Sequence, residues 1–283
     1  MTLDPNDLDE REREVLAALC KRLGDDEFVL AERYTEWQVR SPSLESDLAL
    51  SNIAQDELGH ARLWYDLLID LGYEEPEIVY ERDADEWHHS TLVEQPFAEG
   101  DWTDPIVRSY LYDVAEKLRL ATLEESTHPK IADRVGKIQG EENYHLEHAQ
   151  NWLARLVADD EGKERVQNAV DRLFPYALTL FEPVDPDVED DIVDLRLRDA
   201  TLAEMGEEWL SVVIPYLESL DLDVPESGVE GMDGYAVTDE MLPEHVGRDG
   251  SHTEAWSDLF EEFTHTYHDL GRDQSTKIMG RPE

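Results

Sequence analysis

Two stretches of this chain decide its fold: residues 53–71, IAQDELGHARLWYDLLIDL, and residues 135–156, VGKIQGEENYHLEHAQNWLARL. In each stretch, apolar side chains recur every three or four residues, the spacing that places them on one face of an α-helix. Each apolar stripe is interrupted by a glutamate and, three residues later, a histidine. Core-facing carboxylates and imidazoles require partners, because an isolated buried charge is costly. The two stretches therefore predict a helical bundle built around a polar site.

The sequence on either side of these stretches predicts the rest of the bundle. Helical periodicity indicates four long helices, over residues 9–39, 43–71, 105–126 and 131–157. Arg40-Ser41-Pro42-Ser43 joins the first two through a short connection, and His128-Pro129 separates the last two. The acidic stretch 73–104 links the two pairs. Two helical hairpins joined by a long crossover are typical of ferritin-like bundles, so we predict an all-α, ferritin-like four-helix bundle.

The remainder of the chain predicts additional C-terminal helices. Periodicity favours helices over residues 163–181, 195–220 and 253–270, with a loop over 221–248 and a loose tail over 271–283. Pro183-Val184-Asp185-Pro186 separates the first two of these helices. We therefore expect a di-metal helical bundle over residues 9–182. Residues 183–283 should form a helical extension packed on the same domain.

The charge of the chain limits its partners. It contains 69 Asp+Glu against 24 Lys+Arg, a formal net charge of -45. Such a charge repels nucleic acid and anionic membrane surfaces, so neither is expected as a partner. High net charge can also prevent folding. However, the hydrophobic fraction of 40% and the seven tryptophans favour a folded core inside an acidic coat, as in halophilic organisms.

Cysteine content and the N-terminal residues bear on the compartment. The single cysteine, Cys20, excludes an intramolecular disulfide or a thiolate metal cluster. Residues 1–5 lack the basic and apolar segments of a signal peptide, and no run of about 18 apolar residues is present. We expect a cytoplasmic protein without a membrane span.

The pattern Glu-x-x-His occurs five times, so a bare match carries little weight in so acidic a chain. The instances are Glu57/His60, Glu86/His89, Glu125/His128, Glu142/His145 and Glu262/His265. The second, third and fifth fall in the crossover, at a helix end and on the last helix, and we interpret them as solvated polar residues. Only the first and fourth interrupt apolar stripes, where a metal site is the favoured interpretation. The alternative is a Glu–His hydrogen bond within each helix.

A ferritin-like metal site needs one further carboxylate from each of the other two helices. Glu27 shares an apolar stripe on the first helix at the depth of Glu57, with Glu32 as its rival. Asp113 lies at the matching depth on the third helix, with Glu116 as a possible substitute. Either acid could instead be an ordinary surface carboxylate.

The predicted ligand set holds four carboxylates and two imidazoles. Its members are Glu27, Glu57, His60, Asp113, Glu142 and His145. Oxygen-rich ligation with one nitrogen for each metal suits a pair of iron ions, with manganese as a possibility. Zinc would be expected in a smaller tetrahedral site.

Several motifs resemble the ferritin-like subunits of the multicomponent phenylacetyl-CoA 1,2-epoxidase. Residues 40–44 and 55–60 resemble the hairpin and metal helix of its catalytic A subunit, as do Leu111-Tyr112-Asp113 and residues 141–145. Residues 47–53, 92–96 and 250–254 are more similar to its companion C subunit. The resemblance covers roughly residues 20–182, with a weaker match at 250–270.

This resemblance implies a function. In that family the C subunit is typically a structural partner that has lost its metal ligands, whereas this chain has an acid or a histidine at all six positions. It implies two irons that activate dioxygen and deliver one oxygen atom to the ring of phenylacetyl-CoA. The other atom would leave as water, with electrons from a separate reductase. Arg108, Lys117 and Arg119 are candidates for contacting the CoA, or are ordinary solvated helix charges.

Two alternatives remain for the role of the chain. The first is a non-catalytic scaffold subunit of the same complex. The second is a free-standing ferritin-like iron-binding protein, which would oxidise iron without a reductase or a CoA thioester. The metal, the exact substrate and the stoichiometry of the complex do not follow from the sequence.

Overall fold

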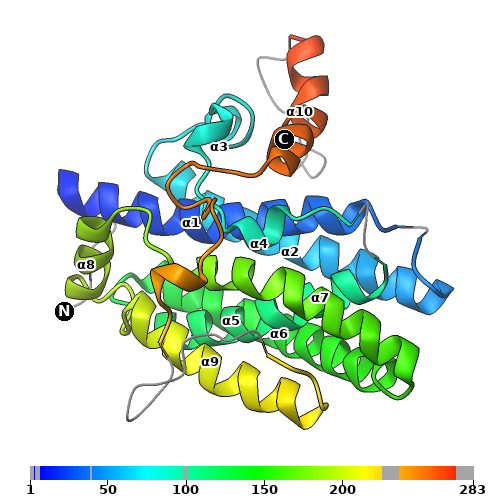
Figure 1. Cartoon of the computed structure of the whole chain (residues 1–283). Coiled ribbons are helices and arrows are strands. Elements are labelled where there is room, and N and C mark those ends of the chain that lie inside the picture. The colour runs from blue at the N-terminus through cyan, green and yellow to red at the C-terminus, as the bar shows by residue number, and fades with distance from the viewer. Residues whose placement is uncertain (1–2, 4–6, 39, 98–100, 225–235, 272–283) are drawn as a thin grey trace.

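The computed structural model describes residue 3 and residues 7–38, 40–97, 101–224 and 236–271, and these residues form helices and loops without β-strands. The four long helices are α1 (Glu10–Thr35), α2 (Leu44–Asp70), α5 (Thr103–Leu123) and α6 (Pro129–Leu156). α1 pairs along its length with α2, and α5 with α6, so the two pairs form two layers (Figure 1). The fold is the predicted all-α, ferritin-like bundle.

Local sequence explains where the long helices begin. The side chain of Asp9 accepts a hydrogen bond from the backbone of Glu12, whose side chain in turn caps Asp9 at the start of α1. Ser43 caps α2 by accepting a hydrogen bond from the Ser46 backbone. Pro129 occupies the first turn of α6, where a missing N–H costs nothing.

The crossover between the two pairs is longer than a hairpin loop and is partly helical. It contains the short elements α3 (Glu75–Val79), η1 (Ala84–Glu86) and α4 (Thr91–Glu94). α4 lies against α1 and α7, and its residues are all buried. The crossover therefore forms part of the core.

Further helices follow the four long ones in the chain. They are α7 (Asp160–Leu178), η2 (Thr179–Phe181), α8 (Pro186–Asp194), α9 (Leu202–Ser219), η3 (Asp239–Met241) and α10 (Glu254–Asp269). α7 and α9 both pack on α5, and α8 packs on α1. The buried indole of Trp209 on α9 donates a hydrogen bond to the Leu111 carbonyl of α5, 2.9 Å away.

One predicted helix boundary is wrong. The predicted helix over residues 195–220 begins only at Leu202. A helix that was not predicted, α8, precedes it and starts at Pro186, the last residue of the predicted separator. Asp185 caps α8 and Pro186 occupies its first turn, so this proline starts a helix. Arg196, with φ of 55°, ends α8 in the left-handed conformation. Thr201 and Glu204 then form a capping box that starts α9.

The last helix, α10, lies beside α3 on the far side of α1 from the other layer (Figure 1). Phe263 of α10 packs edge-on against Phe28 of α1, with ring centroids 5.3 Å apart. Tyr267 stacks on Tyr80, at the end of α3, at 4.6 Å. The predicted loop over 221–248 falls partly, and the predicted tail almost wholly, outside the described residues.

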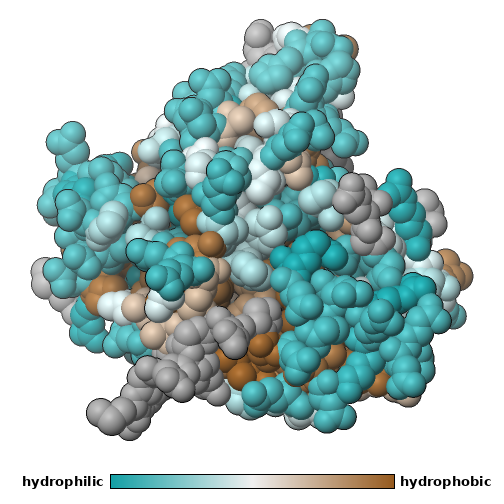
Figure 2. All heavy atoms as spheres, viewed as in Figure 1, coloured by the Kyte–Doolittle hydropathy of each residue, from teal (hydrophilic) through white to brown (hydrophobic). Residues whose placement is uncertain are grey.

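The buried apolar residues form two clusters along the bundle axis. On α1, one cluster runs to Leu23 and the other begins at Val29, and on α2 they run to Ala54 and from Ala61. Glu27, Glu57, His60, Glu142 and His145 fall in the gap between the clusters, and Asp113 lies at the edge of the cluster that contains Val29. Hydrophilic side chains cover most of the face seen in Figure 2. Among the described residues, no helix has the length and apolar character needed to cross a membrane.

Candidate metal centre

Five of the six predicted ligands lie in the polar layer between the two apolar clusters, and Asp113 lies at the edge of the cluster that contains Val29, between Tyr112 and Val114. None of the six is more than 3% exposed. Ligand atoms of Glu27, Glu57, His60 and Glu142 lie within 4.8 Å of one another. Nδ1 of His145 lies 3.5 Å from Glu57 Oε1 and 3.4 Å from Glu142 Oε1. α1, α2 and α6 thus bring five of the six predicted residues together.

The histidines direct the same ring nitrogen toward the centre. Nδ1 of His60 lies 3.2 Å from Glu142 Oε1, 3.7 Å from Glu57 Oε2 and 3.8 Å from Glu27 Oε2. Nδ1 of His145 faces the same group of acids. Glu57 and Glu142 each approach the imidazole on the other helix as well as the one on their own, and Glu27 approaches His60 from α1. Hydrogen bonds confined to one helix therefore do not describe the arrangement.

The outer nitrogens of the two rings have partners that the sequence analysis missed. Nε2 of His60 on α2 lies 2.7 Å from Glu141 Oε2 on α6, and Nε2 of His145 on α6 lies 3.3 Å from Asp56 Oδ2 on α2. The available signal was an acid immediately before each ligand glutamate, in Asp56-Glu57 and Glu141-Glu142. A carboxylate that accepts the outer N–H leaves the lone pair of the inner nitrogen free for a metal.

Two acids on α5 line the centre. Asp113 is buried, and its Oδ2 accepts a hydrogen bond of 2.8 Å from Ser109. Burial and the charge of Glu142 raise the pKa of Asp113 well above its usual range. Glu116, the predicted substitute, is also fully buried, and it contacts Arg119. Both acids face the centre, so α5 provides two carboxylates where the pattern required one.

Glu32, the predicted rival of Glu27, faces elsewhere. It is half-buried, and burial together with the charges of Glu262 on α10 and Glu36 raises its pKa. Glu27, by contrast, is completely buried beside Glu57 and His60. The acid of α1 that belongs to the centre is therefore Glu27.

The centre contains buried polar atoms without hydrogen bonds, which is the arrangement expected of a site that binds a cation. Within the described residues, both carboxylate oxygens of Glu27, Glu57 and Glu142 lack a hydrogen-bond partner. The same holds for Nδ1 of His60 and His145 and for Oδ1 of Asp113. Buried polar atoms are normally paired, and so many orphans around one point are costly unless a positive charge occupies it. The donor set suits metal ions with a preference for oxygen and imidazole.

The pKa shifts of the residues in the centre indicate an excess of negative charge. Burial and the charges of Glu116 and Glu57 raise the pKa of Glu27 well above its usual range. Burial alone would lower the pKa of His145, but contacts with Glu142 and Glu57 raise it to about 12. The same opposition raises the pKa of His60. A bound cation would neutralise the charge that these protons otherwise balance.

The other Glu-x-x-His pairs do not join the centre, and the solvated interpretation is only partly right. Glu262 and His265 are exposed, as expected. His89 and His128, however, are buried, at 0% and 2% exposure, while their partners Glu86 and Glu125 are exposed. Tertiary packing covers these rings with segments distant in sequence, which a helix-face argument cannot foresee.

The solvated interpretation is also wrong for two of the candidate CoA-contacting residues. The guanidinium of Arg108 is completely buried and donates to the carbonyls of Val93 and Gln95. Arg119 is largely buried against Asp26 and Glu116. Only Lys117 is exposed. Buried arginines with internal partners serve the fold or the centre, and neither offers a surface charge for CoA.

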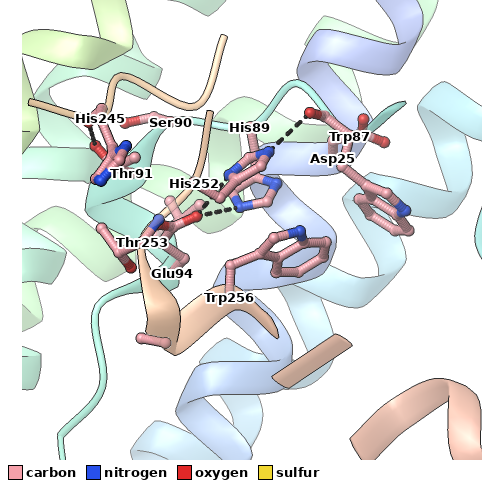
Figure 3. Close-up of polar contacts among 12 residues, drawn as sticks. Asp25, Trp87, His89, Ser90, Thr91, Glu94, His245, His252, Thr253 and Trp256 are labelled. Carbon is pink, nitrogen blue, oxygen red and sulfur yellow. Dashed lines mark hydrogen bonds and ion pairs between the residues drawn. The ribbon is translucent and has the colours of Figure 1, made fainter. Parts of the chain in front are cut away.

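His89 belongs to a second carboxylate–imidazole cluster, formed by His89, Glu94 and His252 (Figure 3). Glu94 Oε2 lies 2.8 Å from both His89 Nε2 and His252 Nδ1, and its Oε1 accepts the Thr253 N–H at 2.7 Å. Nε2 of His252 lies 2.9 Å from the Trp87 carbonyl, so both nitrogens of this ring face acceptors. These hydrogen bonds fasten the start of α10 to the crossover, while Nδ1 of His89 is buried without a hydrogen-bond partner among the described residues.

These features define a class of protein: a ferritin-like helical bundle with a carboxylate–histidine centre that can hold metal. The chain belongs to the phenylacetic acid catabolic protein family, whose model matches residues 1–271. It is 30% identical, over 254 residues, to the C subunit of the 1,2-phenylacetyl-CoA epoxidase of Escherichia coli (strain K12). That match covers 87% of this chain and 94% of the relative.

Proposed function

We propose that this chain is the metal-holding subunit of a dioxygen-dependent epoxidase that acts on phenylacetyl-CoA. The observation that carries the proposal is the buried ligand set. Neighbouring helices contribute carboxylate oxygens and imidazole nitrogens to it, and these atoms have no hydrogen-bond partner among the described residues. The similarity to an epoxidase subunit along nearly the whole of that relative supports the substrate. As in that relative, whose name denotes one subunit, other subunits would complete the enzyme.

Glu27, Glu57, His60, Asp113, Glu142 and His145 would hold two iron ions, the usual pair in bundles of this kind. When bound, such ions would activate dioxygen, so that one oxygen atom would be delivered to the aromatic ring and the other would leave as water. Electrons would come from a separate reductase subunit.

The protein's own residues prepare the centre. Glu141 and Asp56 hold the outer nitrogens of His60 and His145, so the inner nitrogens stay oriented toward the metal position. The apolar clusters on both sides keep bulk water away from the carboxylates. In such a low-dielectric site, charge–charge interactions are stronger than in water.

The first test is the iron content after anaerobic loading with Fe(II) in high salt, for the wild type and for Glu57→Ala/Glu142→Ala. We expect about two irons per chain in the wild type, as in di-iron bundles, and their loss in the variant. An absence of iron in both proteins would overturn the metal centre. Fe(II) oxidation that needs neither reductase nor CoA thioester would favour a free-standing iron-binding protein.

A second candidate function is that of a scaffold subunit of the same complex. The observation that supports it is that the relative is the C subunit of its enzyme. Epoxidation by the reconstituted complex separates the two roles. Loss of epoxidation with Glu57→Ala/Glu142→Ala, while the complex still assembles, supports a catalytic centre in this chain. Full epoxidation with the same variant would assign catalysis to another subunit.

A further inference from the structure

The C-terminal part of the chain sends one arginine into the bundle. Arg248 lies between η3 and α10 and is 0% exposed. Its Nη1 and Nη2 donate to the two carboxylate oxygens of Asp26 on α1, at 3.0 and 2.7 Å. Nη1 also donates to the His88 carbonyl at 2.7 Å. Arg248 thus forms a bidentate ion pair with an acid 222 residues earlier in the chain.

Asp26 is shared with a second arginine. Arg119 Nη1 on α5 donates to Asp26 Oδ2 at 2.8 Å, and the Ser90 N–H donates to Oδ1 at 2.8 Å. Two arginines therefore share the carboxylate of Asp26, which directly precedes the predicted ligand Glu27.

The other side of Arg119 faces the metal centre. Its Nη2 contacts Glu116 and lies 3.8 Å from Glu27 Oε1, and it donates to the Tyr112 hydroxyl at 2.9 Å. One guanidinium therefore separates Asp26, outside the centre, from two acids that line it. The position of Arg119 depends on how strongly each side attracts it.

We propose that Arg248 is a positioning residue of the metal centre, acting through Asp26 and Arg119 on Glu116 and Glu27. This proposal rests on the metal centre proposed above. With Arg248 present, Asp26 has a cation of its own, and Arg119 remains available to Glu116. Glu116 therefore stays in an ion pair with Arg119 and does not bind metal. The metals are bound by the four predicted ligand carboxylates.

Removal of Arg248 changes this balance. Among the described residues, Arg119 would then be the one arginine still hydrogen-bonded to Asp26, and a buried carboxylate holds such a partner closely. Glu116, with its counter-charge drawn away, would face the same metals as Asp113 and become free to bind them. The coordination of bound iron should therefore change, even if the amount of iron does not.

The test uses the full chain loaded anaerobically with Fe(II) alone, in high salt. Iron per chain and the near-infrared circular dichroism bands of the bound Fe(II) are compared among wild type, Arg248→Gln, Arg248→Lys and His252→Gln. His252→Gln is the matched control, because His252 fastens the same segment at Glu94 without touching Asp26. We expect shifted bands in Arg248→Gln, a smaller shift in Arg248→Lys, which keeps the charge, and wild-type bands in His252→Gln.

Each outcome bears on a separate claim. Unchanged bands in Arg248→Gln, or the same shift in His252→Gln, would overturn the role of Arg248 while leaving the metal centre in place. No iron in the wild type would overturn the centre and the role of Arg248 with it. If Arg248→Gln does not fold, Arg248→Lys against His252→Gln decides the matter, because only the lysine variant should shift the bands.

Discussion

The imidazole of His60 on α2 and the carboxylate of Glu141 on α6 form a hydrogen bond between the two helix pairs, with Nε2 2.7 Å from Oε2. The reverse contact, from His145 on α6 to Asp56 on α2, is longer, at 3.3 Å. Each histidine is thus held by the helix that carries the other histidine. The orientation of both rings depends on the packing of α2 against α6.

The Glu141 contact gives the first prediction. Glu141→Gln should weaken Fe(II) binding by about 10- to 100-fold, the usual cost of removing a carboxylate that orients a metal-binding histidine. Anaerobic Fe(II) titration measures the change. Glu147→Gln, an exposed position on the same helix, is the control and should bind iron like the wild type. Equal affinity in both variants would show that His60 does not need Glu141.

The ligand assignment gives a second prediction. His60→Ala and Glu142→Ala should each lower iron occupancy, because each removes a ligand atom that faces the centre. His265→Ala, the same change at an exposed Glu-x-x-His pair, should not. Elemental analysis after loading measures all three variants. Similar iron loss from His60→Ala and His265→Ala would contradict the assignment.

The long helices and their polar layer could be predicted from the sequence because both rest on local periodicity. Glu57 and His60 interrupt the apolar stripe of one helix, so their burial follows from the spacing of their neighbours alone. Matching depths on the neighbouring helices then pointed to Glu27 and Asp113. Each step required only the helical repeat and the short connections.

Other residues of the site could not be predicted from the sequence because their partners are far away in the chain. Asp56 and Glu141 lie beside the apolar stripe, and their role depends on which neighbouring helix faces that side. Arg248 reaches Asp26 across most of the chain, from a segment without helical periodicity. His89 is buried by the packing of Trp256 and His252, both from the C-terminal part. Such contacts follow from the tertiary fold.

The His89–Glu94–His252 cluster gives a prediction about pH. Burial would raise the pKa of Glu94, but hydrogen bonds from His252 and His89 lower it to about 2, below its usual value of 4.5. A carboxylate whose pKa is lower in the folded state stabilises the fold above the unfolded pKa, and this contribution is lost as the pH falls toward the folded pKa. The shift corresponds to about 3 kcal/mol at neutral pH.

Glu94→Gln should therefore unfold more easily than the wild type at pH 7, by an amount of that order. The difference between the two proteins should shrink as the pH falls from about 4.5 toward 2, because the wild-type carboxylate then takes up a proton. Urea unfolding at pH 7, 4 and 3 measures it. A constant difference across this range would mean that the charge of Glu94 does not stabilise the fold.

The packing of α9 on α5 gives a prediction for the C-terminal extension. Trp209 is completely buried and hydrogen-bonded to Leu111 of α5. Trp209→Ala should cost about 3–5 kcal/mol, as for other buried aromatic residues replaced by alanine. Glu208→Ala, exposed on the same helix, should change the stability little. Denaturant unfolding compares them. A small loss for Trp209→Ala would mean that the extension and the bundle unfold separately.

Glycines within the long helices give a final prediction, with opposite signs at two positions. A Cβ added at Gly136 on α6 would meet nothing within 4 Å, whereas one at Gly24 on α1 would lie 2.4 Å from the Tyr65 ring. Gly136→Ala should stabilise the protein by about 0.5–1 kcal/mol, because alanine loses less backbone freedom in a helix. Gly24→Ala should destabilise it, since the Tyr65 hydroxyl is held by Asp25 at 2.8 Å and the ring cannot move without disturbing that bond. Thermal unfolding of both variants tests the pair.

If both variants are more stable than the wild type, the packing of α1 on α2 at Tyr65 is looser than the structure indicates. If both destabilise, the open side of α6 at Gly136 is covered in solution, and a partner protein seated on that side would then be the first explanation to test.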